Sequence, residues 1–366
     1  MKQQTSAATE TRIKGNTIID FTGKTLYVGI DVHQKDYQVA IVHEDICLGN
    51  HRMPADSKKL IWHLQSRYPG ATLKCVYESS AWGFNLQRHL SAAGIDCIVV
   101  NAADVPSSDK DRKRKDDKRD ARKLSIELSK GNLESIYIPD KEMQAARTLV
   151  RQRYRLVQDQ TRCKNRIKHL LMSNGISIAD ANQHWSLKSI SKIQQSKFES
   201  SLLKASVDFA IEQYLQIRRI LKEITMAIRN ISKEEPFLKV QKFLQSVGGI
   251  GMITGMVIQT EIGDINRFKR FDSLCDYVGF VPDIYSSNDK TIVRGMSQRG
   301  NSFLKETIIE SSWVLIRKDP AMLMKYNEYR SRMSANKAII RIAKHLLSRI
   351  RFLWKNEQLY VKGLVK

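Results

Sequence analysis

The sequence predicts an α/β domain at the N-terminus, a helical arm in the middle and a mostly α-helical domain at the C-terminus. Short apolar runs separated by polar or Gly/Asn breaks occupy residues 25–100, which is typical of strands mixed with short helices. Apolar residues then recur in steps of three and four over residues 207–231, which is typical of a long amphipathic helix. We expect four segments: a flexible tail (1–24), an α/β domain (25–140), a helical coiled-coil region (141–236) and a C-terminal domain (237–366).

The α/β domain is expected to have the element order βββαβαβ, followed by a basic helix. The predicted elements, in that order, are Leu26–Val32, Tyr37–His43, Leu48–Met53, Ser57–Tyr68, Leu73–Glu78, Ala81–Leu90 and Asp96–Val100. Gly94 is expected to end the second helix. This order resembles the ribonuclease-H-like fold that many nucleases and transposases use.

Two acidic residues lie at the ends of apolar strands. Asp31 follows the run LYVGI, and Glu78 follows CVY. Carboxylates held together at strand ends repel one another, so a site that collects them normally needs a divalent cation.

Two further acids lie in the basic stretch RKRKDDKRDARKLSIEL. Asp117 and Asp120 share a helical face with Ala121 and Leu124, whereas Asp116 falls off that face. We therefore expect Asp117 and Asp120 to project toward the sheet and to meet Asp31 and Glu78. The alternative for an acid pair among so many cations is local charge balance.

The overall charge points to nucleic acid as the partner. The chain of 366 residues has 61 Lys and Arg against 38 Asp and Glu, a net charge of +23, and a pI near 9.8. Dispersed cations neutralise phosphates, and four carboxylates beside a polyanion suit one or two Mg²⁺ ions. The candidate phosphate contacts beside the acids are Lys113, Arg114 and Lys115.

The cysteines and the first residues bear on the compartment. The five cysteines are far apart and form no CxxC pair, which favours reduced thiols over a zinc site or disulfides. The start of the chain has no apolar leader, and no apolar stretch approaches the length of a membrane span. We expect a cytoplasmic protein that associates with the nucleoid when it acts.

The central region is expected to form a long helical hairpin or coiled-coil arm. The apolar seam Val207, Ala210, Tyr214, Ile217, Leu221, Ile224, Ile228 and Ile231 is sustained for more than three heptads. An earlier helix over Lys141–Ser173 is its expected antiparallel partner, and Pro236 closes the region. The basic face of that helix is either solvated or in contact with nucleic acid.

The C-terminal domain contains a Gly-rich turn between two apolar helical stretches, SVGGIGMITG. The amides around Gly249 and Gly251 are candidates for a DNA phosphate contact, as in helix-hairpin-helix modules, and a simple packing turn is the alternative. A loop, GFVPDIYSSNDK, and a short strand, TIVRG, come next. Three helices are expected to finish the chain, the middle one with Asp319 as N-cap and Pro320 in its first turn.

Several motifs together resemble transposases of the insertion-sequence 110 family, including its 1111 subgroup. The motifs YVGIDVHQKDYQVAIV, VYESSAWGFNLQRHL and KDDKRDARKL are similar to its DEDD, RuvC-like domain. LQSVGGIG, YVGFVPDIYSS and VRGMSQRGNSFLK are similar to its C-terminal transposase domain. The chain departs from the family pattern at Asp116, where Thr is usual, and at Asn288, where Gly usually follows the serine.

The resemblance implies a DNA transposase or recombinase with a composite site. It implies that Asp31, Glu78, Asp117 and Asp120 bind metal and that Ser287 is the nucleophile that joins covalently to DNA. Ser286 is the competing assignment. It also implies a homodimer or homotetramer, donor and target DNA as substrates, and an element-encoded guide RNA.

Other residues near the serine have two interpretations. Arg294 and Arg299 are candidates for clamping the phosphate, and ordinary surface arginines are the alternative. His33, next to the strand-end Asp31, is expected to be structural or to contact phosphate rather than to bind metal.

Two other functions are compatible with the residues. A metal-dependent, structure-specific nuclease of the junction-resolvase type would use the acids without serine chemistry. A nucleic-acid-binding protein with a degenerate nuclease fold would bind with a steep salt dependence and would need neither the acids nor Mg²⁺.

Overall fold

The computed structural model describes residues 10–13, 16–106, 116–176, 185–287 and 290–363. The chain forms two compact units, residues 1–138 and residues 139–366. Within the described residues, no helix is both long enough and apolar enough to cross a membrane. The predicted combination of a mixed α/β domain and a mostly helical remainder is confirmed.

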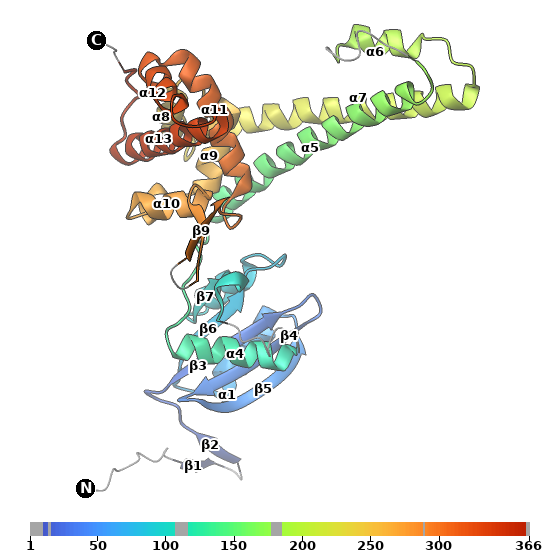
Figure 1. The fold of residues 1–366 in the computed structure, drawn as a ribbon. Coiled ribbons are helices and arrows are strands. Elements are labelled where there is room, and N and C mark those ends of the chain that lie inside the picture. Colours follow the sequence, from blue (N-terminus) through green and yellow to red (C-terminus); the bar gives the residue numbers. More distant parts are fainter. Residues whose placement is uncertain (1–9, 14–15, 107–115, 177–184, 288–289, 364–366) are drawn as a thin grey trace. The chain divides into compact units, whose positions relative to one another are not determined.

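The first unit is built on a five-stranded sheet with the strand order β5-β4-β3-β6-β7 (Figure 1). β3 is central and pairs antiparallel with β4 on one side and parallel with β6 on the other. The strands are β3 (Thr25–Val32), β4 (Asp36–His43), β5 (Ile46–Pro54), β6 (Thr72–Glu78) and β7 (Asp96–Val100). All five predicted strands are therefore present in the predicted order.

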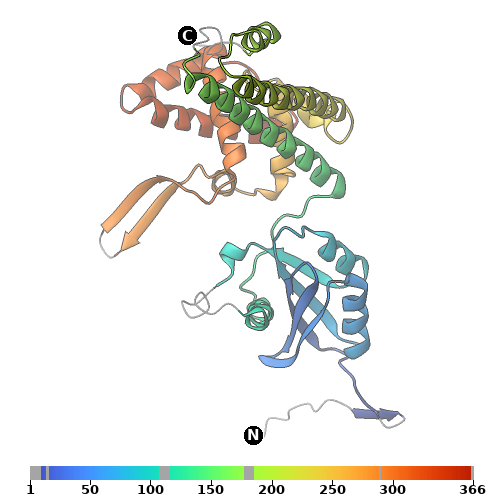
Figure 2. The same cartoon turned by 90° about the vertical axis from the view of Figure 1, so that its right-hand side faces the viewer.

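Helices cover both faces of this sheet. Helices α1 (Ser57–Arg67) and α2 (Asn85–Ala92) pack Leu60, Leu64, Leu86 and Leu90 into one core with alternate residues of β3. Helix α4 (Asp117–Ser129) contributes Leu124 to a smaller core with Val76 and Val100. Figure 2 shows α4, in teal, on the opposite side of the sheet from the two blue helices.

The second unit begins with a long helical arm. α5 (Lys141–Met172) packs against α7 (Ser201–Ile231), and α6 (Leu187–Gln194) lies beside them near the end of the arm. The seam predicted for α7 is buried at Val207, Ala210, Tyr214, Ile224 and Ile228 and half-buried at its other positions. The apolar spacing in the sequence therefore identified the face that packs.

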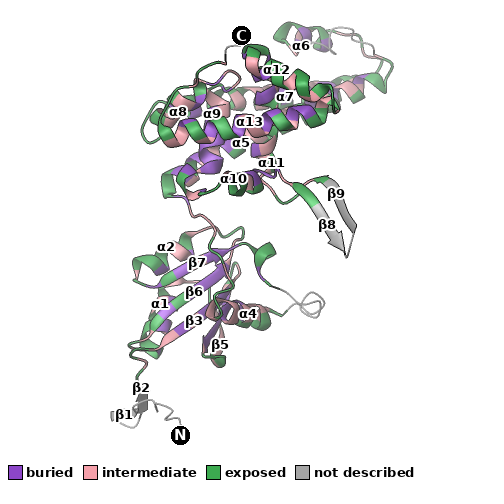
Figure 3. Ribbon diagram, turned by 60° about the vertical axis from the view of Figure 1, so that its left-hand side comes forward, coloured by how far each residue is buried: buried purple, intermediate pink, exposed green. Residues whose placement is uncertain are grey.

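The remaining elements form a helical core with one strand hairpin. They are α8 (Leu238–Gln245), α9 (Met252–Ile262), α10 (Phe271–Val278), β8 (Pro282–Ser287), β9 (Lys290–Met296), α11 (Ser302–Lys318), α12 (Pro320–Arg330) and α13 (Ala335–Asn356). The core is formed largely by α9, α11 and α13 (Figure 3, purple). Asp319 caps α12 and Pro320 lies in its first turn, as predicted.

Three local features differ from expectation or add to it. The segment assigned to a flexible tail includes a two-stranded hairpin, β1 (Glu10–Ile13) and β2 (Asn16–Ile19). α2 begins at Asn85 rather than Ala81, because residues 81–84 form turns in which Gly83 has a positive φ. The segment PDIYSS, predicted as loop, is strand β8, because TIVRG pairs with it as an antiparallel partner.

Candidate metal centre and serine hairpin

Strand alternation directs Asp31 and Glu78 to the same face of the sheet. Val28 and Ile30 of β3 lie in the core with α1 and α2, so Gly29 and Asp31 face α4. Glu78 follows the same alternation in β6, because Val76 belongs to the core that includes Leu124 of α4. The parallel register pairs Ile30 with Tyr77, which makes Asp31 and Glu78 the next residues at the carboxyl ends of their strands.

Gly29 allows α4 to approach the sheet closely. A Cβ atom at Gly29 would lie 2.0 Å from the carbonyl oxygen of Ala121 and 2.6 Å from the amide nitrogen of Ser125. The Asn50 side chain of β5 also donates a hydrogen bond to the Lys118 carbonyl oxygen at 2.9 Å. Gly29 therefore leaves room for the backbone of α4 at Ala121 and Ser125, and the hydrogen bond from Asn50 holds its first turn at the sheet.

The two neighbouring acids at the start of α4 have different positions. Asp116 is the N-cap residue, and its side chain accepts a hydrogen bond from the Lys118 amide at 3.2 Å. Asp117 is the first helical residue, and its carboxylate points toward the end of β3. Helical phase had separated these two residues in the sequence, and the cap gives Asp116 a structural role.

Asp31, His33 and Asp117 form a compact group of potential metal ligands. Their ligand atoms all lie within 4.8 Å of one another. His33 Nε2 is 3.0 Å from Asp31 Oδ2 and 3.5 Å from Asp117 Oδ2. The side chains are 24%, 40% and 47% exposed for Asp31, His33 and Asp117, so an ion and a phosphate can reach them from solvent.

The donor set fits a divalent cation. Carboxylate oxygens are the ligands that Mg²⁺ and Mn²⁺ prefer, whereas an imidazole nitrogen is a better ligand for transition metals than for Mg²⁺. His33 was expected to be structural or to contact phosphate, yet its ring nitrogen belongs to the close group. The signal in the sequence was its position two residues after a strand-end carboxylate.

Glu78 and Asp120 lie outside this close group of three. Both side chains are half-buried, and each makes a contact with another residue. The strand register places Glu78 on the face of the sheet that α4 covers. Asp120 lies in the first turn of α4. Lys113, Arg114 and Lys115, the expected phosphate contacts, lie outside the described residues.

The candidate nucleophiles lie at the end of a strand. Ser286 and Ser287 are the last two residues of β8, and their backbones pair with Thr291 and Lys290 of β9. Arg294 lies in β9, and Arg299 is exposed in the segment that leads to α11. The structure thus places both serines beside the turn of a two-stranded hairpin.

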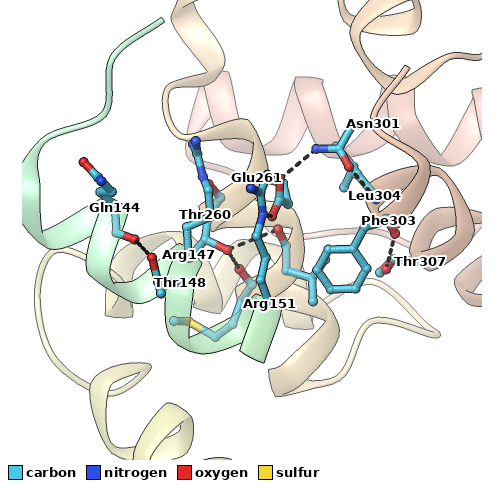
Figure 4. A network of polar contacts seen from close by, with 12 residues as sticks. Gln144, Arg147, Thr148, Arg151, Thr260, Glu261, Asn301, Phe303, Leu304 and Thr307 are labelled. Atoms are coloured by element: carbon cyan, nitrogen blue, oxygen red, sulfur yellow. Dashed lines mark hydrogen bonds and ion pairs between the residues drawn. The ribbon is translucent and has the colours of Figure 1, made fainter. Parts of the chain in front are cut away.

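One buried residue, Glu261, contacts the segments on both sides of this hairpin. Glu261 of α9 is 0% exposed and accepts two hydrogen bonds from Arg151 of α5, at 2.7 and 2.8 Å. Asn301, which follows the hairpin, donates to Glu261 Oε2 at 2.7 Å, and the Tyr277 hydroxyl, which precedes it, donates to the Glu261 carbonyl oxygen at 2.7 Å. Figure 4 shows Arg151 and Asn301 directed at Glu261, with Arg147 donating to the adjacent Thr260 carbonyl.

The two glycines singled out in the turn between α8 and α9 differ in their surroundings: Gly249 packs against α11, whereas the space around Gly251 is open. Gly249 has a φ of +106°, and a Cβ there would lie 2.6 Å from the Ser311 carbonyl oxygen of α11. Gly251 is the N-cap of α9, and a Cβ there would meet nothing within 4 Å. Helix packing accounts for Gly249, and the amides beyond Gly251 begin a helix that no side chain caps.

Comparison with known proteins gives consistent matches along the chain. A family model described as "Transposase", for the DEDD domain of IS110 elements, matches residues 28–174, and one described as "Transposase IS116/IS110/IS902 family" matches residues 241–327. Together these matches cover more than half of the chain.

Individual relatives carry the same description. A putative transposase of Sinorhizobium fredii is 26% identical over 65% of this chain and 57% of its own length. Transposases for IS1533 of Leptospira borgpetersenii and IS1111A of Coxiella burnetii are 24% and 26% identical, over 67% and 68% of this chain and 72% and 68% of their own lengths. The chain belongs to the IS110 family of transposases.

Proposed function

We propose that this protein moves an insertion sequence by cutting and rejoining DNA strands, with Ser287 as the nucleophile. The observation that carries the proposal is the group formed by Asp31, His33 and Asp117, where a strand end meets a helix start. The order of the sheet, three antiparallel strands followed by two parallel ones, supports a RuvC-like, ribonuclease-H-like fold for the first unit.

The acids would hold one or two Mg²⁺ ions. Asp31 and Asp117 would provide the nearest oxygens, and Glu78 and Asp120 would complete the set from the same side of the sheet. Bound ions would neutralise charge on the phosphodiester and on the oxygens that attack and leave. His33 would orient the Asp31 carboxylate and contact the phosphate, since its Nε2 is 3.0 Å from Asp31 Oδ2.

The serine step is a transesterification. The Ser287 hydroxyl oxygen loses its proton and attacks phosphorus, one DNA oxygen leaves as a hydroxyl, and the strand stays attached to the protein as a phosphodiester. Attack by the hydroxyl of a second strand then restores Ser287 and joins the DNA. Because one phosphodiester replaces another, the exchange needs no external energy source.

Family membership supports the remaining parts of the proposal. We propose donor and target DNA as substrates, a homodimer or homotetramer as the active form, and an element-encoded RNA as the guide. The net charge of +23 is the property of this chain that favours such polyanionic partners.

Trapping the protein on DNA tests the nucleophile. The full chain is incubated with Mg²⁺ and DNA from the element ends, and the attached peptide is mapped by mass spectrometry. We expect an adduct at Ser287 that Ser287→Ala abolishes and that the matched variant Ser286→Ala retains. An adduct at Ser286 would move the nucleophile by one residue.

The same variants distinguish a serine transposase from a metal-dependent nuclease. If Ser287→Ala and Ser286→Ala both cleave DNA at the normal rate while Asp31→Asn does not, the enzyme is a metal-dependent nuclease without serine chemistry. If Asp31→Asn leaves cleavage unchanged, the metal centre proposed here is wrong.

A further inference from the structure

A pocket lies next to the candidate metal centre within the first unit. It is a pocket of about 450 Å³, formed where β3 ends and where α1 and α2 begin. His33 lines it, and the same ring approaches Asp31 to 3.0 Å. A ligand in this pocket is therefore one side chain away from the candidate metal ligands.

Two of the residues that line the pocket are aromatic, one with an exposed ring and one with a hydroxyl group. Trp82, in the turn before α2, lines the pocket and is 45% exposed. Tyr37 also lines it and is only 8% exposed, yet its hydroxyl has no hydrogen-bond partner among the described residues. A hydroxyl that makes no hydrogen bond within the chain can bond to a ligand or to water in the pocket.

The charge of the lining excludes phosphate as the preferred ligand. None of the residues described around this pocket is Lys or Arg, although the chain has 61 of them, and Asp56 is among them. The polar groups are instead neutral or weakly basic, namely Gln34, Asn85, His33 and His89. Side-chain amides both donate and accept hydrogen bonds, and such groups recognise the edge of an unpaired nucleobase.

We propose that this pocket binds one unpaired base of the DNA strand whose phosphate lies at the metal centre. The base stacks on Trp82, and the Tyr37 hydroxyl and the amides of Gln34 and Asn85 bond to its edge. The identity of the strand rests on the proposed function, whereas the pocket and its chemistry do not. Holding one base would fix which phosphate is presented to Asp31 and Asp117.

Fluorescence of a base analogue tests the pocket. Single-stranded oligonucleotides with 2-aminopurine at successive positions are bound to the full chain, with Ca²⁺ in place of Mg²⁺ to prevent cleavage. We expect quenching at one position, because the analogue stacks on Trp82. Trp82→Ala should abolish this quenching and raise the Kd about tenfold, and Trp82→Phe should retain most of both.

A second tryptophan gives a matched control. Trp62 of α1 is 71% exposed and does not line the pocket, so Trp62→Ala should leave quenching and Kd unchanged. Equal behaviour of Trp82→Ala and Trp62→Ala, with melting temperatures that show both are folded, would overturn the proposal. So would equal affinity for an oligonucleotide that lacks the base at the quenched position.

The serine variant separates this proposal from the strand-exchange reaction. Ser287→Ala should retain the quenching, because the serine belongs to the other unit and does not line the pocket. If no serine adduct forms but quenching depends on Trp82, the base site stands and the serine mechanism fails. If the adduct forms and Trp82→Ala changes nothing, the reverse holds.

Discussion

At the scale of single residues, Gly29 shapes the candidate metal centre without carrying any functional group. Its absent side chain lets the backbone of α4 lie against β3, which brings Asp117 toward Asp31. A carboxylate pair that spans two elements depends on the distance between those elements as much as on the acids themselves.

The substitution Gly29→Ala should separate the two carboxylates. The new methyl group would lie 2.0 Å from a backbone oxygen, so α4 must shift, and overpacking of this kind costs about 1–3 kcal/mol. Urea unfolding should show that loss, and calorimetry should show weaker Mg²⁺ binding. Gly251→Ala is the control, because a Cβ there meets nothing within 4 Å, and an equal loss in both variants would contradict this account.

The substitution Asp31→Asn should remove metal-dependent chemistry and leave the fold intact. Its carboxylate is the central partner of His33 and belongs to the close ligand group, whereas Asp116 only caps a helix. We expect DNA cleavage to fall by about a thousandfold or more, as for loss of a principal electrostatic group. Asp116→Asn should retain cleavage because Asn also caps helices, and equal losses would argue against the site.

The sequence predicted part of this site because it depends on local periodicity. The ends of two apolar runs located Asp31 and Glu78 at strand ends, and helical phase distinguished Asp117 from Asp116. The nearness of His33 to Asp117 was not predicted, since it depends on how closely α4 approaches β3. That approach depends on a glycine in another element, which no local pattern reveals.

At the scale of elements, one ion pair joins the arm to the core of the second unit. Arg151 of α5 binds Glu261 of α9, and the pair raises the pKa of the Arg151 guanidinium through that hydrogen bond. The Glu261 side chain is fully buried, so its charge is compensated by its partners alone.

Loss of Arg151 should destabilise the second unit strongly. Arg151→Met leaves a buried carboxylate without its cation, and because the Arg151 side chain is itself half-exposed, we expect a cost of about 3 kcal/mol, the lower end of the range for fully buried pairs. Lys239→Met is the matched control, because Lys239 and Glu357 form an exposed pair that contributes at most about 1 kcal/mol. Urea denaturation of the two variants should differ accordingly, and equal stability would show that the buried pair is dispensable.

The packing of α12 on α13 should depend on pH through His345. Burial lowers the pKa of His345 below its ordinary value of 6.5, and Lys325, Arg349 and Arg341 add to that effect. The unfolded chain therefore binds a proton at His345 more readily than the folded chain does. The contribution of neutral His345 to the stability of the fold is complete above pH 6.5 and is lost as the pH falls.

Melting temperatures between pH 8 and pH 5 test this dependence. The decrease on acidification should be smaller in His345→Gln than in the unsubstituted protein. His169→Gln, which changes an exposed histidine of α5, should follow the unsubstituted protein. An identical decrease in all three would exclude His345 as the titrating group.

Elements with strong periodicity were predicted well, and those that depend on a partner were not. The apolar seam from Val207 to Ile231 predicted the buried face along most of α7. The strand β8 was missed because PDIYSS is polar and becomes a strand only when β9 pairs with it. The beginning of α2 was placed too early because the turn at Gly83 interrupts an otherwise helical pattern.

At the scale of the whole molecule, the two units have separate hydrophobic cores. The cores around β3 belong to residues 1–138, and those of the arm and of α9, α11 and α13 belong to residues 139–366. Each unit can therefore unfold in a cooperative transition of its own.

Calorimetry should resolve two thermal transitions, of which only one responds to metal. Mg²⁺ bound at the acids would stabilise the first unit, by about 2.7 kcal/mol at one hundred times the Kd. Mg²⁺ should raise one transition and leave the other unchanged, and Asp31→Asn should abolish the shift. A shift of both transitions would indicate that the units unfold together.

Glu261 connects the arm to the segments on both sides of the serine hairpin through hydrogen bonds. Its carboxylate accepts hydrogen bonds from Arg151 of α5 and from Asn301, which follows the hairpin. Its backbone oxygen accepts one from Tyr277 of α10, the helix that precedes the hairpin. A movement of α5 at Arg151 would therefore displace the segments that flank the hairpin or break one of the hydrogen bonds to Glu261. These three contacts of Glu261 thus couple the start of the arm to both segments that flank the serine hairpin.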